Sequence, residues 1–173
     1  MGRVAGRAIL ITGAYGSGKS TVAAEAATVL ERAGRPYALL DLDYLMWADP
    51  PDVDVHDDPA LLLANLEAVV RNDRRVGIEE FVLAGHVRAD VVGAIRSTLG
   101  VPLAVVALDV PWAEIVRRLT TGATTARAED LREAERQVAS SSASDADFVV
   151  RNDRPASETA DEILRLAGWH DSG

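Results

Sequence analysis

Near its start the chain reads Gly13-Ala14-Tyr15-Gly16-Ser17-Gly18-Lys19-Ser20. These residues match the pattern G-x-x-x-x-G-K-[S/T], in which glycines let successive backbone N–H groups turn inward around a phosphate. The apolar run at residues 8–11 comes just before them and predicts a buried strand, and a helical stripe follows from Lys19. The pattern therefore has the strand–loop–helix setting that its chemistry requires, because the helix N-terminus adds free N–H groups to the phosphate site.

The side chains at the end of this loop have separate tasks in that chemistry. Lys19 would place a point charge on the β- and γ-phosphates, and the hydroxyl of Ser20 would be a ligand for Mg²⁺. Lys19 is also the only lysine in a chain whose other 17 basic residues are arginines. A Gly-rich turn with an incidental lysine is the alternative, and the strand and helix on either side argue against it.

Charge and composition exclude several classes of binding partner and of chemistry for this chain. The 18 basic residues stand against 27 acidic ones, and the formal net charge of −9 disfavours nucleic acid and anionic membranes as generic partners. The absence of cysteine excludes disulfides, zinc–thiolate sites and thiol catalysis. No apolar run has the length of a membrane span, and the first residues lack a signal-peptide pattern, so we expect a cytoplasmic protein.

The rest of the chain alternates short aliphatic runs with longer segments of helical period. Strands are expected at residues 8–11, 37–40, 81–84, 103–108 and 148–150, and helices at 19–33, 59 to about 77, 89–99, 112–120, 128–139 and 157–167. Strands that are apolar on both faces and separated by helices indicate a parallel sheet covered on both sides. Without a repeat or a domain-scale linker, residues 1–173 are expected to form one domain.

The chain resembles the P-loop NTPases of the small-molecule kinase branch, which includes nucleotide, shikimate, gluconate and adenylylsulfate kinases. The form GxxGxGKS of the loop and the chain length carry this resemblance. It implies a three-layer α/β fold, a five-stranded parallel sheet in the order 2-3-1-4-5, a short lid over about residues 118–132, and Mg-ATP as phosphoryl donor. The residues that would bind the nucleotide in the loop are Gly13, Ala14, Tyr15, Gly16, Ser17, Gly18, Lys19, Ser20 and Thr21.

Two carboxylates follow the second predicted strand, at the sheet edge where ligands of open α/β sheets bind. Asp41 and Asp43 are two residues apart, so on a strand they would share one face. One could hold Mg²⁺ and the other could accept the proton of an attacking hydroxyl. The similarity to shikimate and gluconate kinases favours Asp41 for the metal and Asp43 for acceptor contact or as the base. The alternative is that one of them only caps the next element.

The third predicted strand ends in residues that could meet the acceptor. His86 and Arg88 lie at its carboxyl end, and Arg88 could pair with an anionic group. For His86, a loop histidine with ordinary contacts is slightly favoured over contact with the acceptor, whereas for Arg88 neither interpretation is favoured. A Walker-B aspartate is missing here, which argues against motor ATPases and GTPases. The acidic loop at 47–58 could line or cover the acceptor, but such a run is more often a solvated loop. Trp47 could cover an acceptor ring or lie at the edge of the core.

Arginines and a small-residue loop between the fourth and fifth predicted strands suggest the lid. By similarity, Arg118 would lie near the adenine and Arg127 would reach the phosphates. Arg132 and Arg136 are better explained as surface residues that pair with nearby acids. After the fifth strand, Asn152 and Arg154 are candidates for the adenine edge, or members of a plain turn before Pro155.

These features predict an ATP- and Mg²⁺-dependent phosphotransferase that acts on a small-molecule hydroxyl or phosphate acceptor. The catalytic candidates are Lys19, Asp43 and Arg127. Two other classes stay open: an ATP-binding regulatory protein, which would not consume ATP on an acceptor, and a simple NTP hydrolase. The sequence carries no signature for the identity of the acceptor.

Overall fold

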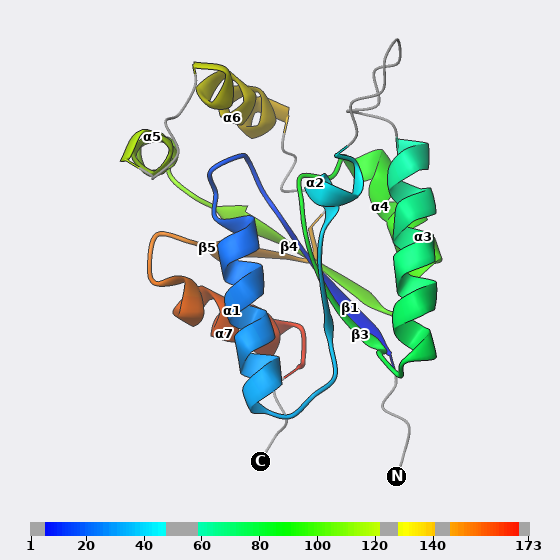
Figure 1. Cartoon of the computed structure of the whole chain (residues 1–173). Coiled ribbons are helices and arrows are strands. Elements are labelled where there is room, and N and C mark those ends of the chain that lie inside the picture. Colours follow the sequence, from blue (N-terminus) through cyan, green and yellow to red (C-terminus); the bar gives the residue numbers. More distant parts are fainter. Residues whose placement is uncertain (1–5, 48–58, 122–127, 141–145, 170–173) are drawn as a thin grey trace.

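The computed structural model describes residues 6–47, 59–121, 128–140 and 146–169. Its five strands form one parallel sheet in the order β2-β3-β1-β4-β5 (Figure 1). The strands are β1 (Arg7–Thr12), β2 (Ala38–Asp41), β3 (Glu80–Ala84), β4 (Leu103–Asp109) and β5 (Phe148–Arg151). The predicted fold class, strand number and strand order are confirmed.

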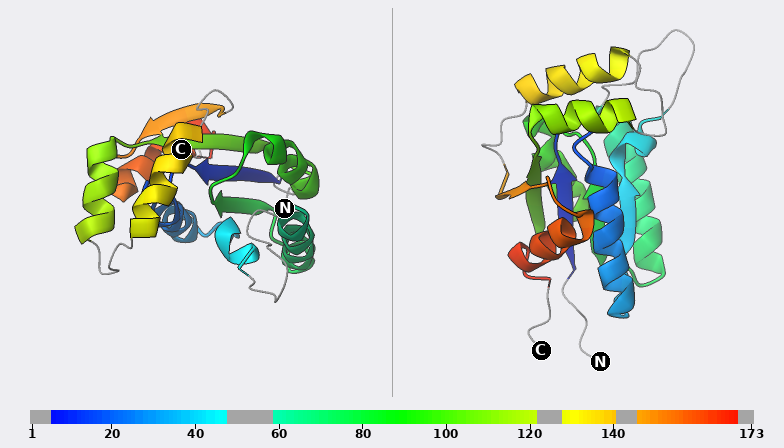
Figure 2. Two further views of the ribbon diagram at one scale, coloured as in Figure 1. Left: turned by 90° about the horizontal axis from the view of Figure 1, so that it is seen from above. Right: turned by 90° about the vertical axis from the view of Figure 1, so that its left-hand side faces the viewer.

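Helices cover both faces of this sheet, as Figure 2 shows. The helices α1 (Lys19–Arg32) and α7 (Ala156–Leu166) pack on one face, and α3 (Pro59–Arg75) and α4 (Ala89–Leu99) pack on the other. Three further helices lie at the carboxyl edge of the sheet: α2 (Leu42–Leu45), α5 (Trp112–Thr121) and α6 (Ala128–Ser140). The expected helix positions are confirmed to within about two residues, and α2 is an addition.

The central strand β1 explains why the sheet needs cover on both sides. Ile9 and Ile11 point into the core beneath α1 and α7, whereas Ala8 and Leu10 point into the core beneath α3 and α4. All four side chains are at most 1% exposed. Alternation of side chains between two buried faces therefore accounts for the unbroken apolar run in the sequence.

A charged cluster closes the amino edge of the sheet. Glu80, which is 4% exposed, accepts from Arg7 Nε at 2.9 Å and from Arg35 Nε at 3.0 Å. Both guanidinium groups also lie over the ring of Trp169, at 4.8 Å for Arg7 and 5.4 Å for Arg35. The buried carboxylate is thus paired on both sides, and the cluster ties β1, β3 and the end of α7 together.

None of the helices in the described part of the chain combines the length and the apolar character that a bilayer crossing demands.

Candidate functional site

The phosphate-loop pattern joins β1 to α1 at the carboxyl edge of the sheet. Gly16 has φ 78° and Gly18 has φ 92°, a region that side chains with a Cβ disfavour. A Cβ on Gly18 would also lie 2.9 Å from the Asn152 amide, and one on Gly16 would lie 3.0 Å from Leu119. The loop therefore requires glycine for its backbone shape and for the close approach of its neighbours.

The start of α1 is open toward this loop. The residue that precedes the helix is Gly18, and no side chain caps the first N–H groups. Uncapped N–H groups at a helix N-terminus attract an anion. The loop and the helix together therefore have the local shape and polarity of a phosphate cradle.

Lys19 is held inside the loop. It is 7% exposed, and its Nζ donates to the carbonyl oxygen of Ala14 at 3.1 Å. Burial lowers the pKa of Lys19, and the nearby carboxylates of Asp43 and Asp41 oppose that shift. The ammonium is therefore shielded from water and lies near two carboxylates. A bound phosphate would give it a further anionic partner.

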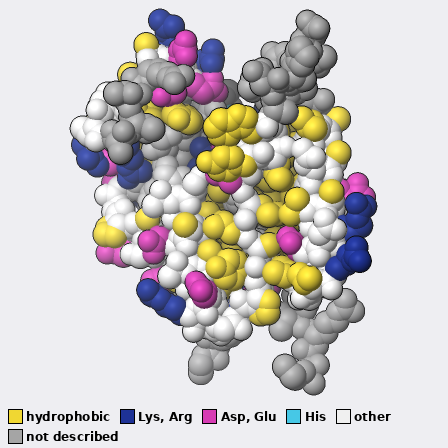
Figure 3. All heavy atoms as spheres, in the orientation of Figure 1, with side chains coloured by type: hydrophobic (Ala, Val, Ile, Leu, Met, Phe, Trp, Pro, Cys, Tyr) yellow, Lys and Arg dark blue, Asp and Glu magenta, His cyan; other side chains and the backbone are white. Residues whose placement is uncertain are grey.

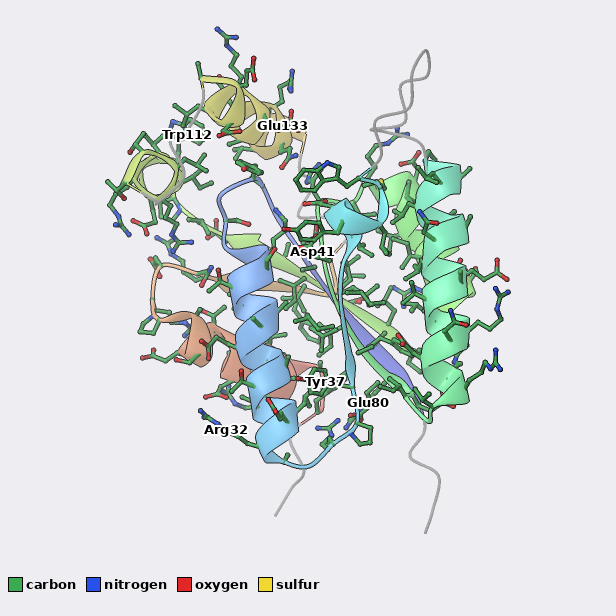
Figure 4. The ribbon with its side chains drawn as sticks, viewed as in Figure 1. Arg32, Tyr37, Asp41, Glu80, Trp112 and Glu133 are labelled. Atoms are coloured by element: carbon green, nitrogen blue, oxygen red, sulfur yellow. The ribbon has the colours of Figure 1, made fainter. Side chains whose placement is uncertain are left out.

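The structure joins Ser20 and Asp41, the two residues expected at the metal. Ser20 Oγ donates to Asp41 Oδ2 at 2.8 Å (Figure 4 shows Asp41 where β2 meets α2). Mg²⁺ takes few protein oxygens and fills its other positions with water and phosphate, so this hydroxyl–carboxylate pair fits a partial ligand set. Within the described residues, no group of three or more acids or histidines is placed around a metal position.

The expected arrangement of Asp41 and Asp43 on one strand face is wrong. β2 ends at Asp41, whose Oδ1 accepts from the N–H of Asp43 at 3.0 Å and so caps the short helix α2. The chain turns at this point, and Asp43 lies in the helix rather than on the strand. The capping alternative therefore holds for Asp41, together with its contact to Ser20.

Asp43 and His86 nevertheless meet beside the loop. A Cβ on Gly85 would lie only 2.8 Å from Leu42 Cβ, so the glycine lets α2 pack tightly on the end of β3. The backbone N–H of His86 lies close enough to the Asp43 carboxylate to contribute to its electrostatics. Burial is the main cause that raises the pKa of Asp43, while Lys19 and His86 lower it.

The imidazole of His86 is partly withdrawn from water. Burial and the charge of Lys19 lower the pKa of His86, whereas the backbone of Gly13 and the carboxylates of Asp43 and Glu133 raise it. Its Nδ1 is buried without a hydrogen-bond partner in the described structure. His86 therefore lies at the site as expected, next to the phosphate loop.

A cavity of about 280 Å³ opens next to His86, between the phosphate loop, α4 and α6. Its wall is mainly apolar, with Ala107 of β4 and Val149 of β5 among the lining residues. Arg88 also lines it, and the Arg88 guanidinium donates to Asp90 Oδ1 at 3.0 Å. Arg88 thus lies near the expected acceptor region, in an exposed ion pair at the start of α4.

Two of the predicted nucleotide contacts brace the phosphate loop directly. The carbonyl oxygen of Ser17 accepts from Arg118 Nη1 at 3.0 Å and from Asn152 Nδ2 at 2.7 Å. Arg118 also donates to the carbonyl of Asn152 at 2.6 Å. Arg154 has other partners, because it pairs with Glu162 of α7 and donates to Thr159 Oγ1 at 3.4 Å. The structure therefore brings Arg118 and Asn152 to the loop and directs Arg154 to α7.

The predicted lid has helices α5 and α6 at its ends, and its central residues 122–127, including Arg127, lie outside the described residues. Arg136 pairs with Glu133 within α6, as expected for a surface arginine. Sequence reasoning missed that Gln137 Oε1 of α6 accepts from the N–H of Tyr15 at 2.7 Å. This contact docks α6 on the phosphate loop, and no motif signals it.

No protein-family model and no curated protein matches the sequence. Among solved structures, it is similar to a gluconokinase from Sinorhizobium meliloti, with 22% identity, TM-score 0.63 and 93% of each chain covered. It is also similar to an APS kinase from Mycobacterium tuberculosis in complex with AMPPNP and APS, with 22% identity, TM-score 0.64, and 94% of this chain and 97% of that one covered. A shikimate kinase from Acinetobacter baumannii in complex with shikimate matches at 17% identity and TM-score 0.59, over 95% and 93% of the two chains.

The chain has the fold of the small-molecule P-loop kinases. At these identities the likeness extends to the architecture, and the roles of individual residues rest on the site itself. In this P-loop kinase fold, Lys19, Asp41, Asp43 and His86 all lie at the carboxyl edge, where open α/β sheets bind their ligands.

Proposed function

We propose that this protein is a Mg-ATP-dependent phosphotransferase that acts on a hydroxyl or phosphate of a small molecule. The observation that carries the proposal is the meeting of a glycine-built phosphate cradle, the buried ammonium of Lys19 and the carboxyl of Asp43 at one edge of the sheet. A nucleoside triphosphate would bind in the cradle, and the acceptor would bind beside Asp43. The solved kinases of the same fold support this reading.

Each side chain would contribute through charge or position. Lys19 would neutralise the β- and γ-phosphates, and the N–H groups at the start of α1 would hold them in line. Ser20 and Asp41 would hold Mg²⁺, which supplies further charge neutralisation when bound. Arg118 and Asn152 would keep the loop in its binding shape through the carbonyl of Ser17. Arg127, on the predicted lid, would add positive charge at the transferred group.

The transfer step assigns the proton to Asp43. The acceptor oxygen attacks the γ-phosphorus, the bond from that phosphorus to the β–γ bridging oxygen breaks, and ADP leaves with the electron pair. Asp43 orients the acceptor hydroxyl and takes its proton. Partial desolvation raises the pKa of Asp43, which makes the carboxylate a better proton acceptor than an aspartate of ordinary pKa.

The organisation of the chain as one domain with a short lid over about residues 118–132 remains part of this proposal. The contact between α6 and the N–H of Tyr15 supports the proposed lid, because a movement of α6 would break or form a hydrogen bond to the phosphate loop. A cytoplasmic location likewise stays a prediction from composition.

A metabolite-library screen with Mg-ATP tests the proposal. We expect at least one small-molecule acceptor to stimulate ADP formation and to appear as a phosphorylated product, with both signals lost in Lys19→Ala. Tight ATP binding with no stimulation by any acceptor would favour a nucleotide-dependent regulator. Phosphate release without an acceptor would favour a simple hydrolase.

A further inference from the structure

Two aromatic side chains stand in water at the candidate site. Tyr44 is 67% exposed and Trp47 is 75% exposed, and their rings stack with centroids 5.5 Å apart and an interplanar angle of 10°. Figure 3 shows hydrophobic side chains gathered over α2 beside an acidic one. Full burial of such rings would add roughly 1.5–3 kcal/mol each to the free energy of unfolding. The exposed rings do not make this contribution to stability.

The exposure is built into the fold, because α2 is firmly anchored. Leu42 is fully buried, Asn65 Nδ2 of α3 donates to the carbonyl of Leu45 at 2.7 Å, and Asp41 caps the first turn. The N–H of Trp47 donates to the carbonyl of Tyr44 at 3.3 Å, which continues the helical winding to the tryptophan. The two rings are therefore held in a fixed pair on a short, well-braced element.

The same winding puts the rings next to the proposed base. Residues three and four positions apart on a helical turn lie on one side of it, so Trp47 lies on the side of Tyr44 and also on the side of Asp43. The other member of the proposed site on this side, His86, lies near Asp43, and each group shifts the pKa of the other. A ring stacked on the aromatic pair would thus place its substituents at the carboxyl that takes the proton.

We propose that Tyr44 and Trp47 form a stacking surface that selects acceptors with a planar, unsaturated ring. The inference rests on the proposed phosphotransferase function and adds the class of acceptor. An offset-stacked pair presents a further flat π-face to a third ring, and stacking of one base or ring on an aromatic side chain changes binding by about 5-fold to 150-fold. Acyclic polyols and saturated rings offer no π-face, so they gain nothing from this pair.

The first test compares two alcohols that differ in planarity. The probes are 2-naphthylmethanol and its saturated counterpart, decahydro-2-naphthylmethanol, titrated into the whole protein with Mg-ADP by calorimetry and ligand-observed NMR. We expect the planar alcohol to bind at least about 5-fold more tightly. Equal affinity for the two alcohols would overturn the inference. Adenosine, uridine and gluconate, added as competitors, distinguish a nucleobase from an aromatic carbocycle and from an acyclic acceptor.

Matched variants locate the preference. Trp47→Leu and Tyr44→Leu should remove the preference for the planar alcohol, while Trp47→Phe should keep most of it because a ring remains. Trp112→Leu is the control, since Trp112 is also exposed, at 42%, but lies on α5 away from α2 (Figure 4). A preference that survives in Trp47→Leu and Tyr44→Leu would overturn the inference.

Turnover separates this inference from the function on which it rests. If a library acceptor without a planar ring is phosphorylated, and Trp47→Leu leaves its KM unchanged while Lys19→Ala abolishes the reaction, the phosphotransferase stands and the stacking surface is wrong. If the planar alcohol binds in a Trp47-dependent manner but no acceptor of any kind is phosphorylated, the phosphotransferase is wrong and the ring belongs to a ligand that is not an acceptor. The expected result is a planar acceptor whose KM rises about 5-fold or more in Trp47→Leu, with kcat nearly unchanged and with Trp112→Leu like wild type.

Discussion

The two edges of the sheet treat buried charge in opposite ways. At the amino edge, Glu80 is paired with two arginines, and both arginines also contact the Trp169 ring. At the carboxyl edge, Lys19 is almost as buried but its Nζ donates to a neutral backbone carbonyl. One edge pairs its buried carboxylate directly with two arginines, whereas the other holds its buried ammonium on a backbone carbonyl, with the carboxylates of Asp43 and Asp41 nearby.

The direction of the pKa shifts expresses this difference. Burial is the leading cause at each of three groups of the carboxyl edge: it lowers the pKa of Lys19, raises the pKa of Asp43 and lowers the pKa of His86. Each shift disfavours the charged form of its group. Such an arrangement does not increase the free energy of unfolding. Clusters of groups with shifted pKa values are typical of ligand-binding and catalytic sites. We therefore expect variants of the carboxyl edge to change activity, and variants of the amino edge to change stability.

The largest effect is expected for Lys19→Met, which keeps an unbranched side chain of similar length without its charge. We expect kcat to fall by on the order of 10³-fold or more, because charge on the transferred group would lose a preorganised partner. The free energy of unfolding should stay unchanged or rise, since a desolvated ammonium is removed. Steady-state kinetics and urea denaturation measure the two quantities.

The matched control for this variant lies at the other end of the same helix. Arg32→Met removes an exposed cation from the last turn of α1 (Figure 4) and should leave kcat unchanged. A Lys19→Met variant that unfolds more easily than Arg32→Met, or that keeps its kcat, would contradict the contrast between the two edges.

The next largest effect is expected for Glu80→Ala, which should lower the free energy of unfolding without changing activity. Removal of the carboxylate leaves two partly buried guanidinium groups without their shared partner, which we expect to cost about 3 kcal/mol of unfolding free energy. The kcat of the folded protein should be unchanged, because the cluster lies at the opposite edge. Denaturation and kinetics at a temperature below the transition check both statements.

The neighbouring residue gives the comparison for Glu80. Glu79 has a side chain that is 25% exposed, and its Oε2 lies 3.5 Å from Arg74 Nε. A more exposed and longer ion pair contributes less, so Glu79→Ala should cost under about 1 kcal/mol. Equal losses in the two variants would show that the amino-edge cluster has no special role in stability.

Asp41→Asn tests the proposed metal pair with a change that keeps hydrogen bonding. The Oδ1 of asparagine can still accept from the N–H of Asp43, and its Nδ2 can donate to the Ser20 hydroxyl in place of the present bond, so the cap and the stability of α2 should survive. The lost charge should raise the Mg²⁺ concentration for half-maximal activity by about 10-fold. A Mg²⁺ titration at fixed ATP measures this shift.

Asp109→Asn is the control for Asp41→Asn, because Asp109 also ends a strand at the carboxyl edge and its Oδ2 lies 3.5 Å from Arg151 Nη1. It should not change the Mg²⁺ requirement. If both variants shift the requirement equally, general negative charge at this edge is responsible and Asp41 has no individual role at the metal.

The contrast between the edges also separates what the sequence reveals from what it does not. The strands could be predicted because each is a short aliphatic run, and the phosphate loop because its glycines, lysine and serine have fixed spacing. The short helix α2 could not, because its four residues form through capping by Asp41 and packing of Leu42 on Gly85. Such contacts override the strand pattern that the sequence suggests at Asp43.

Long-range polar contacts escaped prediction for a similar reason. The amino-edge cluster joins Arg7, Arg35, Glu80 and Trp169, which carry no motif and come together only when the sheet and α7 are assembled. Arg118 and Asn152 were found because the resemblance to kinases pointed to their positions, although the structure directs both side chains to a loop carbonyl. Fixed chemistry leaves a sequence signal, whereas tertiary pairing of ordinary residues does not.

The smallest expected effect is a pH dependence of stability at His86. Burial and Lys19 lower its pKa in the folded protein, with Asp43 and Glu133 opposing them, so below the unfolded value of 6.5 the unfolded chain binds more protons than the folded one. Stability therefore rises with pH in this range, and the contribution of neutral His86 is lost as pH falls through 6.5 toward the folded pKa. Denaturation between pH 5 and 8 should show a smaller loss on acidification in His86→Asn than in wild type. The same loss in both would mean that the carboxyl edge does not hold this imidazole in its neutral form, and the contrast with the amino edge would then rest on Lys19 and Asp43 alone.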